Sequence, residues 1–248
     1  MNLIMFQLIA ATMDISGPVM ILLSAALIPV FFLLIYIYRQ DKIEPEPKRL
    51  LGKLFLLGAL SVVSALILET IGEGILSAMV PKESVVLYQF LMNFIVVACS
   101  EEGGKRFFLR RGSWNDPAFN YRFDGVVYGV TVSLGFAAAE NISYLASYGL
   151  QIAPMRALTA IPLHCICGVF MGHYYGQTKF FLARGDQVRT AFYRKASIVI
   201  PVLIHGFYDF VASMDSPAMG VIFLIFVIIL DIIAFRSVRR YSQEDLSI

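Results

Sequence analysis

Seven long apolar segments limit what this chain can fold into. An α-helix needs about 20 predominantly apolar residues to cross the hydrocarbon core of a bilayer. Of the 248 residues, 58% are hydrophobic and only 15% are charged, whereas soluble domains are roughly a quarter charged. We therefore predict an all-α fold, a polytopic membrane helix bundle with seven transmembrane helices. The spans are expected near residues 19–38, 52–72, 84–105, 124–145, 156–176, 196–213 and 218–236.

The Lys and Arg residues gather in alternate loops. Of the 20 Lys and Arg residues, only Lys82 and Arg156 fall outside one set of alternating loops and the C-terminus. Cytoplasmic loops carry an excess of Lys and Arg, so we expect the N-terminus outside and the C-terminus inside. The net charge of +2 comes from these loops. We expect a multi-pass protein of the cell membrane, with the lipid bilayer but no nucleic acid among its partners.

The sequence has no internal repeat, low-complexity tract or second domain. We therefore predict a single transmembrane domain over residues 1–248. Its core is expected at residues 40–213, and residues 236–248 are expected to form a cytoplasmic tail.

Two adjacent carboxylates, Glu101 and Glu102, close the third apolar segment. A carboxylate in hydrocarbon costs roughly 2.5–3.5 kcal/mol on insertion scales, so the pair needs an explanation. One explanation is structural: the pair lies at the water boundary and forms salt bridges with Lys105 and Arg106. The other is functional, and the later apolar segments favour it because each contains an ionisable residue of its own.

Three later segments carry these ionisable residues. Glu140 follows a run of small residues, and His164 lies one turn before a stripe of glycines that predicts close helix packing. His205 and Asp209 are four residues apart, so they share one helix face. Ionisable residues at such depths are rare and usually functional. The candidate catalytic residues are therefore Glu101, Glu102, Glu140, His164, His205 and Asp209.

A further carboxylate pair lies at the outer end of the second segment. Glu69 and Glu73 are four residues apart and share one helix face. Because they lie near the outer interface, we expect both to be solvated rather than functional.

Carboxylates and imidazoles together support two related kinds of chemistry. They can transfer protons to and from water, or they can bind a divalent metal that activates it. The sequence contains no nucleophile elbow, no Gly-rich phosphate loop and no His-Glu-x-x-His helix. The best match is hydrolysis by an activated water, with a glutamate as the base.

The motifs in this order and spacing resemble those of the PrsW intramembrane proteases. The resemblance rests on Glu101-Glu102-x-x-Lys105, Phe136-x-x-x-Glu140-Asn141, the lone His164 and His205-x-x-x-Asp209, and it extends to the Glu44-Pro45-Glu46-Pro47 loop and to Asp124-Gly125. It implies an intramembrane endopeptidase within the broader superfamily of CAAX-processing and bacteriocin-processing membrane proteases. The implied substrate is a membrane-anchored protein, such as an anti-sigma factor that is cleaved on its outer side.

The resemblance leaves the cofactor open. CAAX-processing relatives typically have a histidine where this chain has Glu140, and the loss of one imidazole favours a glutamate-activated water over zinc. Two histidines with carboxylates could still bind zinc, as in His₂Glu sites. The metal is therefore left undecided, with zinc as one option.

Two further questions are open at this stage. Glu101 lies about 6 Å along its helix from Lys105, whereas Glu140 lies about 24 Å from Asp124, so straight parallel helices would place them at different depths. The same polar residues would also suit an ion-coupled transporter, although no inverted repeat supports one, or a catalytically inactive binding protein.

Overall fold

The computed structural model describes residues 16–81 and 83–248. These residues form helices, and no strand occurs among them. In chain order the elements are α2 (Ser16–Tyr38), α3 (Lys48–Met79), α4 (Val85–Leu91), the π-helix η1 (Met92–Ala98), α5 (Cys99–Ser113), α6 (Asp124–Tyr148), the 3-10 helix η2 (Leu150–Ile152), α7 (Ala153–Leu158), α8 (Ala160–Ala183), α9 (Gln187–Ala212) and α10 (Pro217–Gln243).

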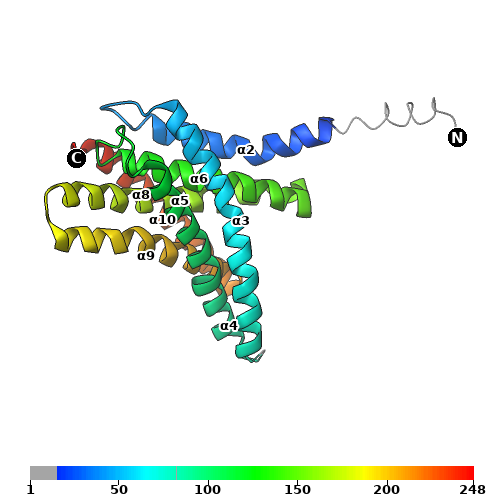
Figure 1. Ribbon diagram of the computed structural model, residues 1–248. Coiled ribbons are helices and arrows are strands. Elements are labelled where there is room, and N and C mark those ends of the chain that lie inside the picture. The colour runs from blue at the N-terminus through cyan, green and yellow to red at the C-terminus, as the bar shows by residue number, and fades with distance from the viewer. Residues whose placement is uncertain (1–15, 82) are drawn as a thin grey trace.

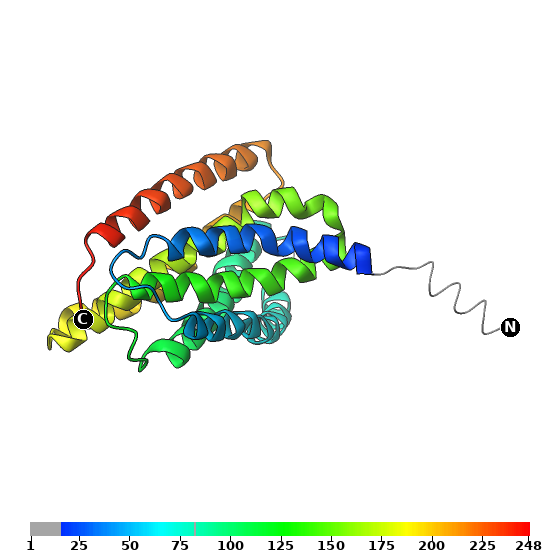
Figure 2. The ribbon, with the colours of Figure 1, turned by 90° about the horizontal axis from the view of Figure 1, so that it is seen from above.

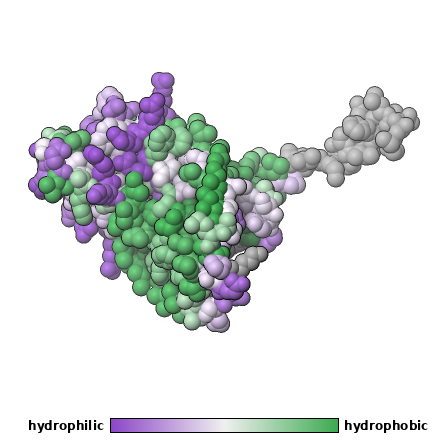
Figure 3. Space-filling view, turned by 60° about the horizontal axis from the view of Figure 1, so that its bottom comes forward, coloured by the Kyte–Doolittle hydropathy of each residue, from purple (hydrophilic) through white to green (hydrophobic). Residues whose placement is uncertain are grey.

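Seven helical segments in the described residues are long and apolar enough to cross a membrane. Many large hydrophobic side chains face outward, including Leu66, Ile67 and Ile225, each more than half exposed in the isolated chain. Figure 3 shows a broad hydrophobic surface, with most hydrophilic side chains gathered at one end and a smaller group at the opposite edge. The predicted fold class is confirmed, and the chain is a multi-pass membrane protein. Its orientation stays a prediction.

The helices extend further than the hydropathy of the sequence predicts. The third span was expected at residues 84–105, but its helix runs from Val85 to Ser113. The fifth was expected at 156–176 and runs from Leu150 to Ala183. Hydropathy marks only the part of a helix that is apolar, whereas the backbone hydrogen bonds continue into charged residues that are themselves good helix formers.

The segment predicted as a tail, residues 236–248, begins inside a helix. α10 continues to Gln243, and the chain then turns back towards the start of α6. There the backbone N–H of Ile248 donates to the carbonyl of Asn120 at 2.7 Å. The C-terminal residues therefore pack on the bundle.

α6 lies at the centre of the bundle and is buried over most of its length. It packs against α8 through glycines, as the sequence predicts. Gly125 and Gly129 face Gly168, Gly172 and Gly176, and a Cβ added at Gly129 would lie 2.8 Å from the Cα of Gly172. Larger side chains at this crossing would force the two helices apart.

α3 crosses α6 at a second close contact. Gly58 lies against the backbone of Val132, and Gly135 lies against the backbone of Phe55. From this crossing α3 runs away from the bundle beside α4 and α5, at a steep angle to α2 and α6 (Figure 1). Figure 2 looks nearly along α3, with α2 and α6 lying across the view. The two helices therefore touch at the crossing and separate beyond it.

A cluster of carboxylates joins the first loop to the start of α6. Asp41, Glu46 and Asp124 each place one oxygen within 4.8 Å of the others. The Tyr128 hydroxyl donates to Glu46, and Asp124 accepts from the backbone N–H of Tyr121 at 2.7 Å. Burial raises the pKa of Glu46 to about 9, and the nearby Asp124 charge adds to this although the Tyr128 hydrogen bond opposes it.

The raised pKa of Glu46 predicts a pH-dependent stability. The folded protein holds a proton that the unfolded chain releases, so the free energy of unfolding should fall as the pH rises from about 4.5 towards about 9. Glu46→Gln should show a smaller fall, because an amide cannot ionise. Thermal unfolding in detergent at about pH 6, 7 and 8 measures this. Glu44→Gln, at an exposed neighbouring position, is the control, and equal slopes in wild type and Glu46→Gln would contradict the prediction.

The predicted orientation can be tested by cysteine labelling. Arg111 and Glu83 are exposed, and the orientation expected from the Lys and Arg distribution places them inside and outside the cell, respectively. In a variant with Cys99, Cys165 and Cys167 replaced by serine, a membrane-impermeant maleimide should label Glu83→Cys in intact cells. Arg111→Cys should react only after lysis. Labelling of Arg111→Cys in intact cells would contradict the predicted orientation.

Candidate active site

The glutamate pair lies in the first turn of α5, directly after the π-helix η1. Glu102 is fully buried and Glu101 is 5% exposed. π-Helical turns occur frequently at functional sites, because the extra residue in the turn changes the direction of the side chains that follow. The pair is therefore held inside the bundle rather than at a water boundary.

Lys105, one turn further along α5, is the cation that balances this pair. Its Nζ donates to Glu101 Oε2 at 3.0 Å and to Glu102 Oε1 at 2.8 Å, and it lies 3.0 Å from His164 Nδ1. The side chain is completely buried and its ammonium lies over the ring of Phe136. The expected salt bridge with Lys105 thus forms, but Arg106 donates to Ser197 instead.

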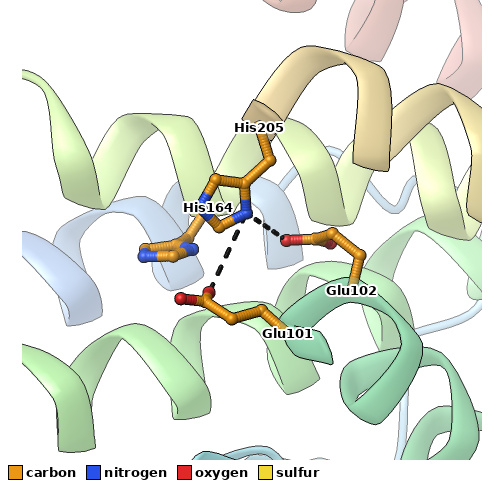
Figure 4. Close-up of side chains that lie close together, drawn as sticks. All are labelled: Glu101, Glu102, His164 and His205. Atoms are coloured by element: carbon orange, nitrogen blue, oxygen red, sulfur yellow. Dashed lines mark hydrogen bonds and ion pairs between the residues drawn. The ribbon is translucent and has the colours of Figure 1, made fainter. Parts of the chain in front are cut away.

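The two nitrogens of His205 face two carboxylates. Nδ1 lies 2.8 Å from Glu102 Oε1 and 3.8 Å from Glu101 Oε2, as drawn in Figure 4. Nε2 lies 3.1 Å from Asp209 Oδ2, one turn along α9. Asp209 therefore holds the outer side of the ring, and the other nitrogen points towards the glutamate pair.

His164 repeats this arrangement from α8. Its Nε2 lies 3.0 Å from Glu140 Oε2, and its Nδ1 faces Lys105. Glu140 is itself held by Arg156, whose Nη2 donates to Glu140 Oε2 at 2.7 Å and whose Nε donates to Asn141 Oδ1 at 2.7 Å. Both histidines thus present Nδ1 to the centre of the site while a carboxylate holds Nε2.

These contacts bring all six predicted residues into one connected set. Glu101, Glu102, His164 and His205 each offer one donor atom, and these atoms lie within 4.8 Å of one another. The set also answers the question of depth. The expectation of different depths assumed that α5 and α6 are parallel. α5 instead runs at a steep angle to α6 (Figure 1), so Glu101 and Glu140 lie in one site although they are at different distances along their helices.

The donor set fits a zinc-type metal ion. Zinc binds imidazole nitrogens and carboxylate oxygens. A histidine that binds zinc usually donates its other ring N–H to a carboxylate, as the contacts of Nε2 with Asp209 and Glu140 would allow here. Glu102 Oε2 is buried and has no hydrogen-bond partner among the residues that the structure describes. Glu102, His164 and His205 could therefore hold a metal.

A cavity of about 470 Å³ opens beside the set. Glu101, His164 and His205 line it, together with residues of α3 that include Glu69. Glu102 is fully buried and is not among the residues that line the cavity. Glu101 is therefore the carboxylate of the pair that a water or a bound chain in the cavity can reach.

Two polar residues of the site carry no functional expectation from the sequence. Arg156 contributes there only to the expected topology, and Glu69 is expected to be solvated. Arg156 and Glu69 both line the cavity. The one sequence signal was that Arg156 is a rare basic residue on its side of the membrane.

Carboxylates and imidazoles beside such a cavity can activate water for hydrolysis, and here they lie within a bundle of membrane-spanning helices. Fold and site together define a polytopic membrane hydrolase.

Comparison with known proteins supports the assignment as a membrane hydrolase. Residues 46–233 match the PrsW family of intramembrane metalloproteases. The protease PrsW of Bacillus subtilis (strain 168) is 35% identical over 195 residues, which cover 79% of this chain and 84% of that protein. The protease PrsW of Oceanobacillus iheyensis is 32% identical over 228 residues, 91% of this chain and 98% of that protein. No solved structure matches the chain.

The chain therefore belongs to the PrsW family, and it is an intramembrane protease. Family membership decides between the functions that the sequence left open, in favour of the protease over the transporter and the inactive binding protein.

Arg156 offers a test of the supporting contacts. Arg156→Gln removes the cation that holds Glu140 and should lower the kcat of cleavage about 10–100-fold, as loss of a supporting residue typically does. Arg156→Lys keeps the charge and should retain more activity. Cleavage of a membrane-anchored reporter in detergent measures both. Arg189→Gln, which breaks an exposed ion pair, is the control and should be nearly silent. Full activity in Arg156→Gln would contradict this role.

Proposed function

We propose that the chain is an endopeptidase that hydrolyses a peptide bond of a membrane-anchored protein, with water activated at Glu101. The observation that carries the proposal is the shared orientation of the two histidines. His205 turns Nδ1 towards Glu102, and His164 turns Nδ1 towards the Lys105 ammonium that bridges the glutamate pair. In both rings Nε2 is held by a carboxylate. By resemblance to the family, the substrate is a membrane-anchored anti-sigma factor that is cleaved on the outer side of the membrane.

Glu101 and Glu102 have different roles in this proposal. Glu101 lines the cavity, so it accepts a proton from the attacking water and returns it to the leaving amine as the peptide bond breaks. Glu102 is fully buried and contacts both Lys105 and His205. It therefore keeps the centre of the site in place rather than reaching the substrate.

Glu102, His164 and His205 are the residues that would hold a zinc ion, as a His₂Glu set with Glu101 left as the base. When bound, zinc supplies a Lewis acid for the peptide carbonyl and lowers the pKa of its water. The Lys105 ammonium contacts two of these three residues, so it competes with a metal for them.

The remaining polar residues position the histidines. Asp209 and Glu140 fix which nitrogen of each ring carries the proton, since each accepts from Nε2 and leaves Nδ1 facing inward. Without a metal, His205 carries a proton on both ring nitrogens, and Nδ1 exchanges its contact with Glu102 for a hydrogen bond to the oxyanion that forms as water attacks. Glu140 and Asp209 are thus positioning residues, and Glu101 and His205 meet the reacting atoms.

Replacement of the glutamates tests the proposed base. Glu101→Gln should lower cleavage of a membrane-anchored reporter by about 10²–10⁴-fold, because glutamine keeps the shape but accepts no proton at neutral pH. Glu102→Gln should also lose activity, through displacement of His205. Membrane insertion and thermal unfolding should stay close to wild type. More than about a tenth of wild-type activity in Glu101→Gln would exclude it as the base.

Metal dependence is tested by measuring metal content and cleavage together in wild type, His164→Ala, His205→Ala and Asp209→Asn. If a metal serves the reaction, purified wild type holds about one equivalent. The histidine variants then lose metal and activity together, and Asp209→Asn binds metal more weakly. If the glutamate-activated water needs no metal, chelators leave cleavage intact and the variants fail with no change in metal content. Wild-type cleavage in both histidine variants contradicts both versions.

A further inference from the structure

The carboxylates that line the cavity differ in how they are neutralised. Glu101 is paired with Lys105, Glu140 with Arg156, and Asp209 with His205. Glu69 lines the same cavity but has no hydrogen-bond or ion-pair partner among the residues that the structure describes. It is therefore the carboxylate on the cavity wall whose charge no described residue balances directly.

Glu69 is partly buried and lines the cavity next to an exposed, apolar face of α3. Beyond the crossing at Gly58, α3 separates from α6, and Val62, Ala65 and Glu69 line the space between them. The adjacent Leu68 is half exposed and faces outward. A membrane-anchored chain that reaches the catalytic residues through this space passes Glu69.

A carboxylate at this position favours an occupant that brings positive charge. Charged groups in membrane-spanning segments are costly unless they are paired. Arg156 also lines the cavity, but its guanidinium is bonded to Glu140 and Asn141 and stacks on Tyr144. It is therefore engaged elsewhere.

We propose that Glu69 is a specificity-determining residue that accepts a basic side chain, Lys or Arg, of the membrane-anchored substrate. The proposal rests on the proposed protease function of the same cavity. A long basic side chain can lay its apolar stem along the cavity wall and place its charge at the carboxylate. The resulting charge-assisted hydrogen bond is short and strong where water is scarce.

A set of membrane-anchored reporters tests this. Lys, Gln or Glu is placed in turn at each position on both sides of the scissile bond, and kcat/KM is measured. At one position the kcat/KM of wild type should be about tenfold or more higher for the Lys reporter than for the Gln reporter, mainly through a lower KM. A hydrogen bond to a charged group stabilises a complex enough to give a ratio of this size. Arg should substitute for Lys there.

Variants at Glu69 then assign the preference. Glu69→Gln should remove the ratio between Lys and Gln reporters, and Glu69→Lys should invert it in favour of Glu. Glu73→Gln, one turn further along α3 and exposed, is the matched control and should keep the wild-type ratio. If Glu69→Gln lowers cleavage of all reporters equally, Glu69 contacts the backbone or supports the fold, and the proposal is overturned. A retained Lys preference overturns it as well.

Failure of this inference is distinguishable from failure of the proposed function. If wild type cleaves the Gln reporters and Glu101→Gln does not, the protease assignment stands whatever the charge preference. If no reporter is cleaved, binding of Lys and Gln reporters to Glu101→Gln decides the role of Glu69. Tighter binding of the Lys reporter that Glu69→Gln abolishes supports the proposal, and equal binding overturns it.

Discussion

A lysine ammonium buried among two carboxylates and an imidazole is the interaction on which the site depends. Lys105 is completely buried and contacts Glu101, Glu102 and His164. Each of these charges alone would be costly inside a membrane bundle, and removal of one partner from a buried ion pair typically costs about 3–5 kcal/mol. The glutamate pair, the lysine and the histidines therefore form one unit that links α5 to α8 and α9.

Helix packing determines the space in which this unit can act. Glycines bring α6 against α8 and α3 against α6 at close crossings, and beyond the second crossing α3 and α6 separate. Residues of both helices line the cavity, which is shared by Glu69 and the catalytic candidates Glu101, His164 and His205. Tight packing at one end and divergence at the other give a membrane-anchored substrate room to reach buried carboxylates.

Much of this could be predicted from the sequence alone. Apolar segments of membrane-spanning length determined the seven helices, because in lipid a chain must satisfy its backbone hydrogen bonds within each helix. Motif spacing indicated the family. Ionisable side chains are costly in hydrocarbon, and this indicated the candidate catalytic residues Glu101, Glu102, Glu140, His164, His205 and Asp209. The glycine stripe of α8 predicted close packing against a neighbouring helix, since small residues let two helix backbones approach.

Other properties were decided only by the tertiary structure. The sequence could not show that Arg156 holds Glu140, that Glu69 lines the cavity, or that Glu101 rather than Glu102 faces it. Each depends on the angle at which helices cross and on which face of each helix meets its neighbour. Spacing along one helix defines a face but not its partner, because side chains from α3, α5, α6, α8 and α9 meet only once all five helices are packed.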